Sequence, residues 1–161
     1  MKILVLGSTG FIGKNIFEYL KSRGYDVYAP NHSKIDALDE KSVLEVFDKV
    51  HYDIVLNALD RNGNDKNYFE NRLRMFQNLA MHNDLYGKMI YFGSGAEYGR
   101  ELPIHNIEES EIDRVIPKDT YGFCLQQMND YARKSENIYN FRLFGIFGKY
   151  ESVSYTHLRA H

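Results

Sequence analysis

The chain has 161 residues, of which 43% are hydrophobic and 26% charged, so its size and composition are those of one globular domain rather than of a disordered protein. Twenty basic against 22 acidic side chains give a formal net charge of −2, which argues against a nucleic acid as the main partner. Its one cysteine, Cys124, cannot form an internal disulfide, and no apolar stretch approaches the ~20 residues that span a bilayer, so we expect a cytoplasmic protein with no membrane partner.

Apolar runs and helical stripes alternate along the chain. In order we predict a strand at 2–6, a helix at 12–20, a strand at 26–29, a helix at 39–50, a strand at 53–56, a helix at 69–80, a strand at 88–92, a helix at 120–132 and a strand at 139–143. The polar segment 100–118 is predicted to be a surface loop or a short helix near the active face. Strands separated by helices imply right-handed crossovers, which predicts a Rossmann-type α/β fold, a doubly wound parallel sheet with helices on both faces.

A glycine-rich turn separates the first strand from the first helix. Gly7 permits the tight turn, Gly10 lets the backbone approach a pyrophosphate, and Gly13 allows the helix to pack closely on the strand. The helix N-terminus offers free N–H groups to the phosphates. A turn without a ligand is the alternative, but the position after the first strand of an alternating pattern favours a dinucleotide site. The expected contacts are Gly7, Thr9, Gly10, Phe11, Ile12 and Gly13.

The spacing of these glycines resembles that of the extended short-chain dehydrogenases/reductases, and especially their NAD-dependent epimerase/dehydratase branch, which acts on nucleotide sugars. Further stretches that resemble this family are Ile35-Asp36, Asn57-Ala58, Asn71, and residues 93–99, 121–124 and 142–148. The resemblance covers about residues 1–150 and implies one NAD(P)-binding Rossmann domain there. It also implies that the nucleotide sugar is the substrate of the intact enzyme and that a homodimer is an open alternative.

The end of the chain departs from this family pattern. Family members continue into a smaller C-terminal lobe that holds the sugar nucleotide, whereas only residues 149–161 follow here. We therefore expect the substrate lobe to be missing. Residues 151–161 are expected to form a short irregular tail, which resembles a translated sequencing adapter rather than natural protein.

The resemblance also implies cofactor contacts outside the glycine turn. Asp36 would accept a hydrogen bond from the adenine amino group, with a backbone contact from Ala37. The alternative is that Asp36 caps the helix that follows. The remaining implied cofactor contacts are Asn57, Ala58, Leu59 and Phe144.

The choice between NAD and NADP depends on the residues after the second strand. Family members that use NAD place an acidic residue there to bind the ribose 2′-hydroxyl. Here the chain has Asn31 and His32, followed by Lys34, and no acid. The cofactor is therefore NAD or NADP, with a lean to NADP, and the alternative is that His32 and Lys34 are only solvated loop residues.

The catalytic positions are incomplete. In the family a Ser polarises the substrate oxygen, a Tyr exchanges its proton, and a Lys four residues after the Tyr assists it. Ser94 and Tyr121 match the first two, although a Ser in a glycine-rich turn needs no catalytic reason, and Leu125 stands at the Lys position. Leu125 cannot stabilise a tyrosinate, so activity is expected to be impaired. Alternatively, Gln126 or Lys118 supplies part of the missing function. No His, Cys or acidic cluster has the spacing of a metal site, and Cys124 is more typical of a small core residue.

These residues predict the cofactor-binding half of an NAD(P)-dependent sugar-nucleotide epimerase, dehydratase or reductase. Two alternatives stay open. One is a non-catalytic dinucleotide-binding or redox-sensing protein, in which Leu125 records lost activity. The other is a folded fragment without ligand affinity.

Overall fold

The computed structural model describes residues 1–60 and 66–151. The tail predicted at 151–161 therefore lies, apart from Glu151, outside the described residues. With η marking a 3₁₀ helix, the elements in chain order are β1 (Lys2–Leu6), α1 (Phe11–Ser22), β2 (Asp26–Tyr28), α2 (Glu40–Phe47), β3 (Tyr52–Asn57), α3 (Tyr68–Ala80), η1 (Asn83–Leu85), β4 (Tyr86–Ser94), η2 (Gly95–Tyr98), η3 (Glu109–Asp113), α4 (Thr120–Ala132) and β5 (Ile138–Leu143).

The strands form one parallel sheet with the order β2-β1-β3-β4-β5. In the sheet, β2 lies on one side of β1 and β3 on the other. The direction in which successive strands are added therefore reverses between β1 and β3. In open parallel sheets, ligands bind outside the carboxyl ends of the strands at such a reversal. The predicted α/β fold is confirmed, and the candidate binding edge is the one where β1 and β3 end.

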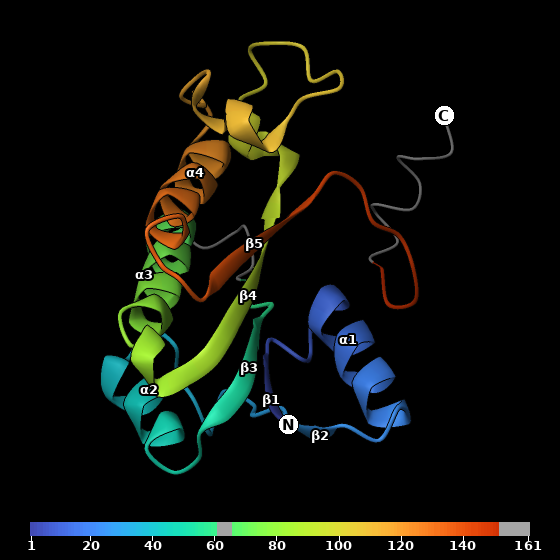
Figure 1. Ribbon diagram of the computed structural model, residues 1–161, viewed down its shortest axis with the longest axis vertical. Coiled ribbons are helices and arrows are strands. Elements are labelled where there is room, and N and C mark those ends of the chain that lie inside the picture. Colours follow the sequence, from blue (N-terminus) through green and yellow to red (C-terminus); the bar gives the residue numbers. More distant parts are fainter. Residues whose placement is uncertain (61–65, 152–161) are drawn as a thin grey trace.

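Alternate residues of β1 pack on opposite faces of the sheet. Leu4 and Leu6 belong to a core between the sheet and α2, α3 and α4, whereas Ile3 and Val5 pack against α1. Figure 1 shows α2, α3 and α4 on one side of the sheet and α1 on the other. The helices therefore cover both faces, as predicted.

Two predicted helix starts are fixed by aspartate caps. The Asp39 side chain accepts a hydrogen bond from the backbone N–H of Lys41 at the start of α2. The Asp119 side chain does the same for the N–H of Gly122 at the start of α4. Each cap satisfies a backbone donor that the first helical turn cannot, so Tyr121 lies in the first turn of α4.

Strand β4 is longer than predicted. It begins at Tyr86, which pairs with Tyr52 of β3, although Gly87 and Lys88 interrupt the apolar pattern. The Tyr86 ring is buried, and its hydroxyl donates to the carbonyl oxygen of Leu79 at 3.0 Å. Tertiary pairing thus extends the strand beyond its apolar run.

The helices of the described chain are all shorter or more polar than a bilayer-crossing helix has to be.

Candidate functional site

The glycine turn is the point where β1, β3 and α1 approach one another most closely. Gly7 has a φ of +78°, and a Cβ built on it would lie 2.3 Å from the carbonyl oxygen of Ala58. A Cβ on Gly13 would lie 2.3 Å from the carbonyl oxygen of Gly7. A side chain fits at neither position, so the turn requires glycine at both.

Gly10 differs from its two neighbours in the turn. A Cβ at Gly10 would meet no protein atom closer than the Gly7 carbonyl oxygen, at 3.4 Å. Gly10 is exposed and is the N-cap of α1, whose first turn contains no acidic residue. The first-turn N–H groups of a helix have no partner within the helix, and the helix dipole favours an anion beside them. The N-terminus of α1 at Gly10 therefore has the features of an anion-binding site.

One cavity, of about 310 Å³, lies between the turn and the end of β2. Its lining residues are Leu6, Gly7, Ser8, Thr9, Pro30, Asn31, His32, Ser33, Ile35 and Leu59. Of the predicted cofactor residues, Gly7, Thr9, Asn31, His32 and Leu59 thus share one cavity. Lys34 borders a different cavity, which Tyr28 and Tyr52 also line.

Four other predicted cofactor residues, Asp36, Ala37, Asn57 and Ala58, do not line this cavity and make contacts within the protein. The Asp36 carboxylate accepts from the N–H of Leu38 at 3.0 Å, while the N-cap of α2 is Asp39. Ala37 is buried, and its carbonyl accepts from the Asn78 amide. Asn57 is also buried and accepts from the N–H of Leu59, and Ala58 contributes the carbonyl against which Gly7 packs.

A second cavity, of about 700 Å³, lies on the other side of Gly10. It brings together Phe11 and Ile12 of the turn with Ser94, Tyr121 and Phe144, all five predicted as site residues. The other lining residues are Asp60, Tyr68, Arg72, Phe92, Gly93, Arg100, Asp119, Leu143, Gly145, Ile146 and Glu151.

Ser94 ends β4 and begins η2. Its hydroxyl oxygen accepts a hydrogen bond from the N–H of Ala96 at 3.3 Å, which leaves the hydroxyl proton to be donated to another oxygen. A Cβ on Gly122 would lie 2.6 Å from the carbonyl oxygen of Ala96, so glycine at this position lets α4 pack closely on η2. This contact holds the first turn of α4, with Tyr121, next to Ser94.

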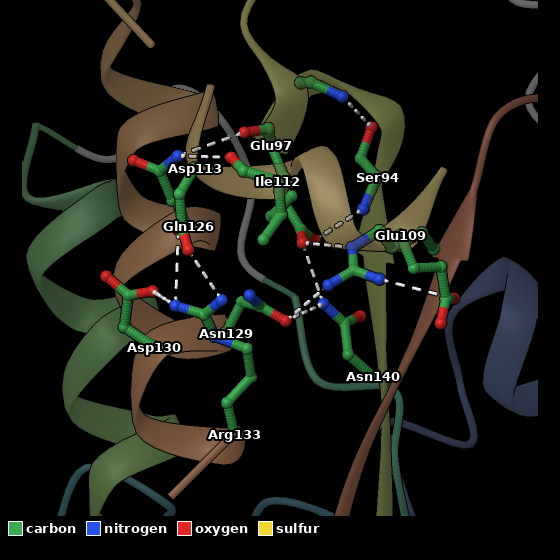
Figure 2. Close-up of polar contacts among 12 residues, drawn as sticks. Ser94, Glu97, Glu109, Ile112, Asp113, Gln126, Asn129, Asp130, Arg133 and Asn140 are labelled. Carbon is green, nitrogen blue, oxygen red and sulfur yellow. Dashed lines mark hydrogen bonds and ion pairs between the residues drawn. The ribbon is translucent and has the colours of Figure 1, made fainter. Parts of the chain in front are cut away.

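A buried carboxylate fixes the Ser94 segment. Glu97 is fully buried and accepts hydrogen bonds from the backbone N–H of Ser94, from the Asn140 amide and from the Nε of Arg142, at 3.0, 2.8 and 2.8 Å. Burial raises the pKa of Glu97 above its ordinary value, although the Ser94 N–H and Arg142 act in the opposite direction. Figure 2 shows Glu97, Asn129 and Asn140 pointing toward one another, with the backbone nitrogen of Ser94 facing the Glu97 carboxylate. This cluster ties η2 to α4 and β5.

The side chains at and near the Lys position do not line the cavity that holds Ser94 and Tyr121. Leu125 is 0% exposed and packs in the core between the sheet and α2–α4. The Gln126 amide donates to the carbonyl oxygens of Ile112 and Val115, both at 3.1 Å. Lys118 is exposed, and neither it nor Gln126 lines the cavity that holds Ser94 and Tyr121.

Three polar residues that were not among the predicted site residues line the second cavity near α3: Asp60, Tyr68 and Arg72. Arg72 donates from Nη1 to Asp60 at 2.6 Å and to the Tyr68 hydroxyl at 3.0 Å. Burial raises the pKa of Tyr68 to about 12, so the Tyr68 hydroxyl stays protonated and donates to Asp60. The Arg72 guanidinium lies over the Tyr121 ring, 5.6 Å from its centroid.

Cys124 and the metal-ligating residue types do not form a second candidate site among the described residues. Burial raises the pKa of the Cys124 thiol, and its Sγ donates to the carbonyl oxygen of Phe69. Among residues 1–60 and 66–151, no group of three or more His, Cys, Asp or Glu side chains is arranged to hold a metal ion.

Solved structures that share this fold include two nucleotide-sugar enzymes with the following matches. A GDP-D-glycero-L-gluco-heptose synthase from Campylobacter jejuni, determined in the presence of NADPH, matches with a TM-score of 0.80 at 17% identity over 91% of this chain and 48% of its own. A dTDP-4-dehydrorhamnose reductase from Bacillus anthracis in complex with NADP matches with a TM-score of 0.73 at 19% identity over 98% of this chain and 58% of its own.

Sequence comparison leads to the same group of proteins. GDP-L-colitose synthase from Yersinia pseudotuberculosis is 21% identical over 168 residues, which cover 94% of this chain and 54% of that protein. The chain thus spans about half the length of these relatives. The family model described as "NAD dependent epimerase/dehydratase family" matches residues 3–160. Because that match covers nearly the whole sequence, the chain belongs to the NAD-dependent epimerase/dehydratase family.

Proposed function

We propose that this chain is the cofactor-binding part of an NADP-dependent reductase or epimerase that acts on a nucleotide-linked sugar. One observation carries the proposal: Ser94 and Tyr121, which come from different elements, line a single cavity together with Phe11 and Ile12 of the glycine turn. A hydroxyl donor and a proton donor are thereby held beside the place where a dinucleotide would bind. The substrate class is supported by the relatives, which include two nucleotide-sugar synthases and a nucleotide-sugar reductase.

The residues present fit a dinucleotide. The two cavities flank Gly10, and the space in front of Gly10 is open to a diphosphate. The cavity with Thr9, Asn31 and His32 would hold the adenosine half, and the cavity with Ser94 and Tyr121 the nicotinamide half. When bound, a nicotinamide supplies or takes up the hydride at a sugar carbon.

The chain's own side chains would handle the proton at the sugar oxygen. Ser94 donates a hydrogen bond to that oxygen and so favours the negative charge that develops on it during reduction. Tyr121 gives up its proton to the same oxygen, and in the reverse direction takes it back. Phe11, Ile12 and Phe144 give this part of the cavity an apolar lining.

Gly10→Ala tests the phosphate cradle. We expect the added methyl group to occupy the space of a phosphate and to weaken NADPH binding roughly tenfold, equivalent to ~1.4 kcal/mol. The chain should fold normally, because a Cβ at Gly10 makes only a 3.4 Å contact with the protein. The measurement is a fluorescence titration with NADPH, with stability followed by urea denaturation.

Gly13→Ala is the matched control. Its Cβ would lie 2.3 Å from the Gly7 carbonyl oxygen, so this variant should lose stability, whereas Gly10→Ala should lose affinity alone. Unchanged NADPH affinity in a folded Gly10→Ala variant would show that the turn holds no phosphate.

Asn31→Asp tests the proposed preference for NADP. A carboxylate in the cavity lined by Asn31 and His32 would repel a 2′-phosphate but accept hydrogen bonds from a ribose 2′-hydroxyl. We expect the ratio of NADPH to NADH affinity to fall by about tenfold or more. Lys34→Ala is the control and should leave the ratio unchanged, because Lys34 borders another cavity. The assignment would be wrong if Asn31→Asp and Lys34→Ala changed the affinity ratio equally, or if neither changed it.

A non-catalytic dinucleotide-binding protein is the second candidate. It is favoured by Leu125, which stands where the family has its lysine and is fully buried in the core. Both candidates require NADPH or NADH binding, so a titration of the folded chain with no saturation by either dinucleotide would exclude both.

A further inference from the structure

Arg72 approaches Tyr121 from a different helix than the family's lysine would. It belongs to α3, its side chain is 9% exposed, and its guanidinium lies 5.6 Å from the centroid of the Tyr121 ring. A guanidinium within about 6 Å of an aromatic ring is attracted to its face. The contact therefore couples a buried cation to the proposed proton donor.

The positive charge of Arg72 is only partly matched. Its carboxylate partner, Asp60, has a 58% exposed side chain, so solvent weakens that pair. The Nε of Arg72 is buried and has no hydrogen-bond partner among the described residues. A buried donor without a partner is costly to keep for stability alone.

Arg72 is also the buried cation of this cavity. Arg100 lines it too but is exposed, while Lys118 lies outside it. Burial by itself would lower the pKa of Arg72, but Asp60, Tyr68 and Tyr121 outweigh it and raise that pKa above its ordinary value. The guanidinium is therefore charged at neutral pH.

We propose that Arg72 is a positioning residue that supplies, from α3, the positive charge that a lysine one helical turn after the tyrosine supplies in the family. The inference rests on the proposed role of Tyr121 as proton donor. During reduction of a sugar carbonyl, hydride adds to the carbon and the Tyr121 O–H bond breaks. The proton forms the new hydroxyl, and the electron pair stays on the Tyr121 oxygen, whose ring lies beneath the Arg72 guanidinium, until solvent returns a proton.

Nitration of Tyr121 by tetranitromethane tests this charge without cofactor or substrate, because the reagent attacks phenolate. Peptide mass spectrometry of the folded chain reports the rate at each tyrosine separately. We expect Arg72→Met to slow nitration of Tyr121 by roughly fivefold or more, since it removes the buried positive charge that lies 5.6 Å from the ring centroid. Arg72→Lys should restore most of the rate, because it keeps the charge.

Asp60→Asn is a second test variant. Unlike Arg72→Met, it does not truncate a buried side chain. It removes the anion paired with Arg72, so nitration of Tyr121 should become faster. The exposed Tyr19 and Tyr139 are internal references whose rates should stay constant in every variant. These arms remain readable if Arg72→Met does not fold.

The proposal is overturned if nitration of Tyr121 is equally fast in the parent chain and in folded Arg72→Met. It is also overturned if Arg72→Lys is as slow as Arg72→Met, or if Asp60→Asn leaves the rate unchanged. The NADPH titration of the parent chain is measured separately. A failure of the proposed cofactor binding is thereby distinguished from a failure of the role given to Arg72.

Discussion

Replacing Glu97 with alanine will lower the free energy of unfolding by about 3–5 kcal/mol, the usual cost of leaving one partner of a buried ion pair alone. Glu97 is fully buried and binds Arg142, whose own side chain is 9% exposed. Without the carboxylate, Arg142 keeps the Asn129 amide oxygen and the exposed Glu109 as partners. Urea denaturation of Glu97→Ala beside the parent chain measures the loss.

Glu109→Gln is the matched control for this prediction. Glu109 contacts the same arginine, at 3.4 Å, but its side chain is 87% exposed, so solvent screens the pair and stability should hardly change. If both variants lost the same amount of stability, burial would not be what makes the Glu97–Arg142 pair the stronger one, and the prediction would be wrong. Because Glu97 also accepts from the Ser94 N–H, the same substitution should loosen the segment that carries the Ser94 hydroxyl.

Leu125→Lys is expected to destabilise the chain by ~3 kcal/mol or more, because it puts an ammonium group among buried apolar side chains. Leu125 is 0% exposed and does not line the cavity with Ser94 and Tyr121. Leu125→Met is the control and should cost less than ~1.5 kcal/mol, since it conserves volume and polarity. Urea denaturation gives both values.

The NADPH affinity of Leu125→Lys separates the two candidate functions. An unchanged or weakened affinity, together with the loss of stability, is expected if α4 has become a packing helix. A small loss of stability with tighter NADPH binding would show that the lysine reaches the cavity, and would favour an enzyme damaged at one position. In that case restored turnover in a full-length version would complete the argument.

Most of the fold could be predicted from the sequence because its local signals agree with its tertiary structure. The apolar run at β1 is covered on both faces, and the helices after it have one apolar stripe each. The helix starts predicted at 39 and 120 lie within one residue of those observed, where Asp39 and Asp119 are the N-caps. The start of β4 could not be predicted, because its pairing with β3 at Tyr86 overrides the local break at Gly87.

The candidate site was only partly predictable, for a physical reason. Ser94 and Tyr121 follow from the family resemblance, which matches them to a serine after the fourth strand and a tyrosine at the start of the next helix. Arg72 lies in the middle of an amphipathic helix, where an arginine is normally read as solvated. Only the packing of α3 on α4 turns it toward Tyr121, and that contact has no local pattern in the sequence.

The close contact between Gly7 and the Ala58 carbonyl also links ligand binding to folding. The turn is completed when β1 pairs with β3 across some fifty intervening residues, so the unfolded chain offers no cradle for a dinucleotide. A ligand that binds only the folded form stabilises it by mass action, by ~2.7 kcal/mol at a free concentration one hundred times its dissociation constant. The melting temperature of this chain therefore becomes a reporter of cofactor choice, since the preferred dinucleotide shifts it further at equal concentration.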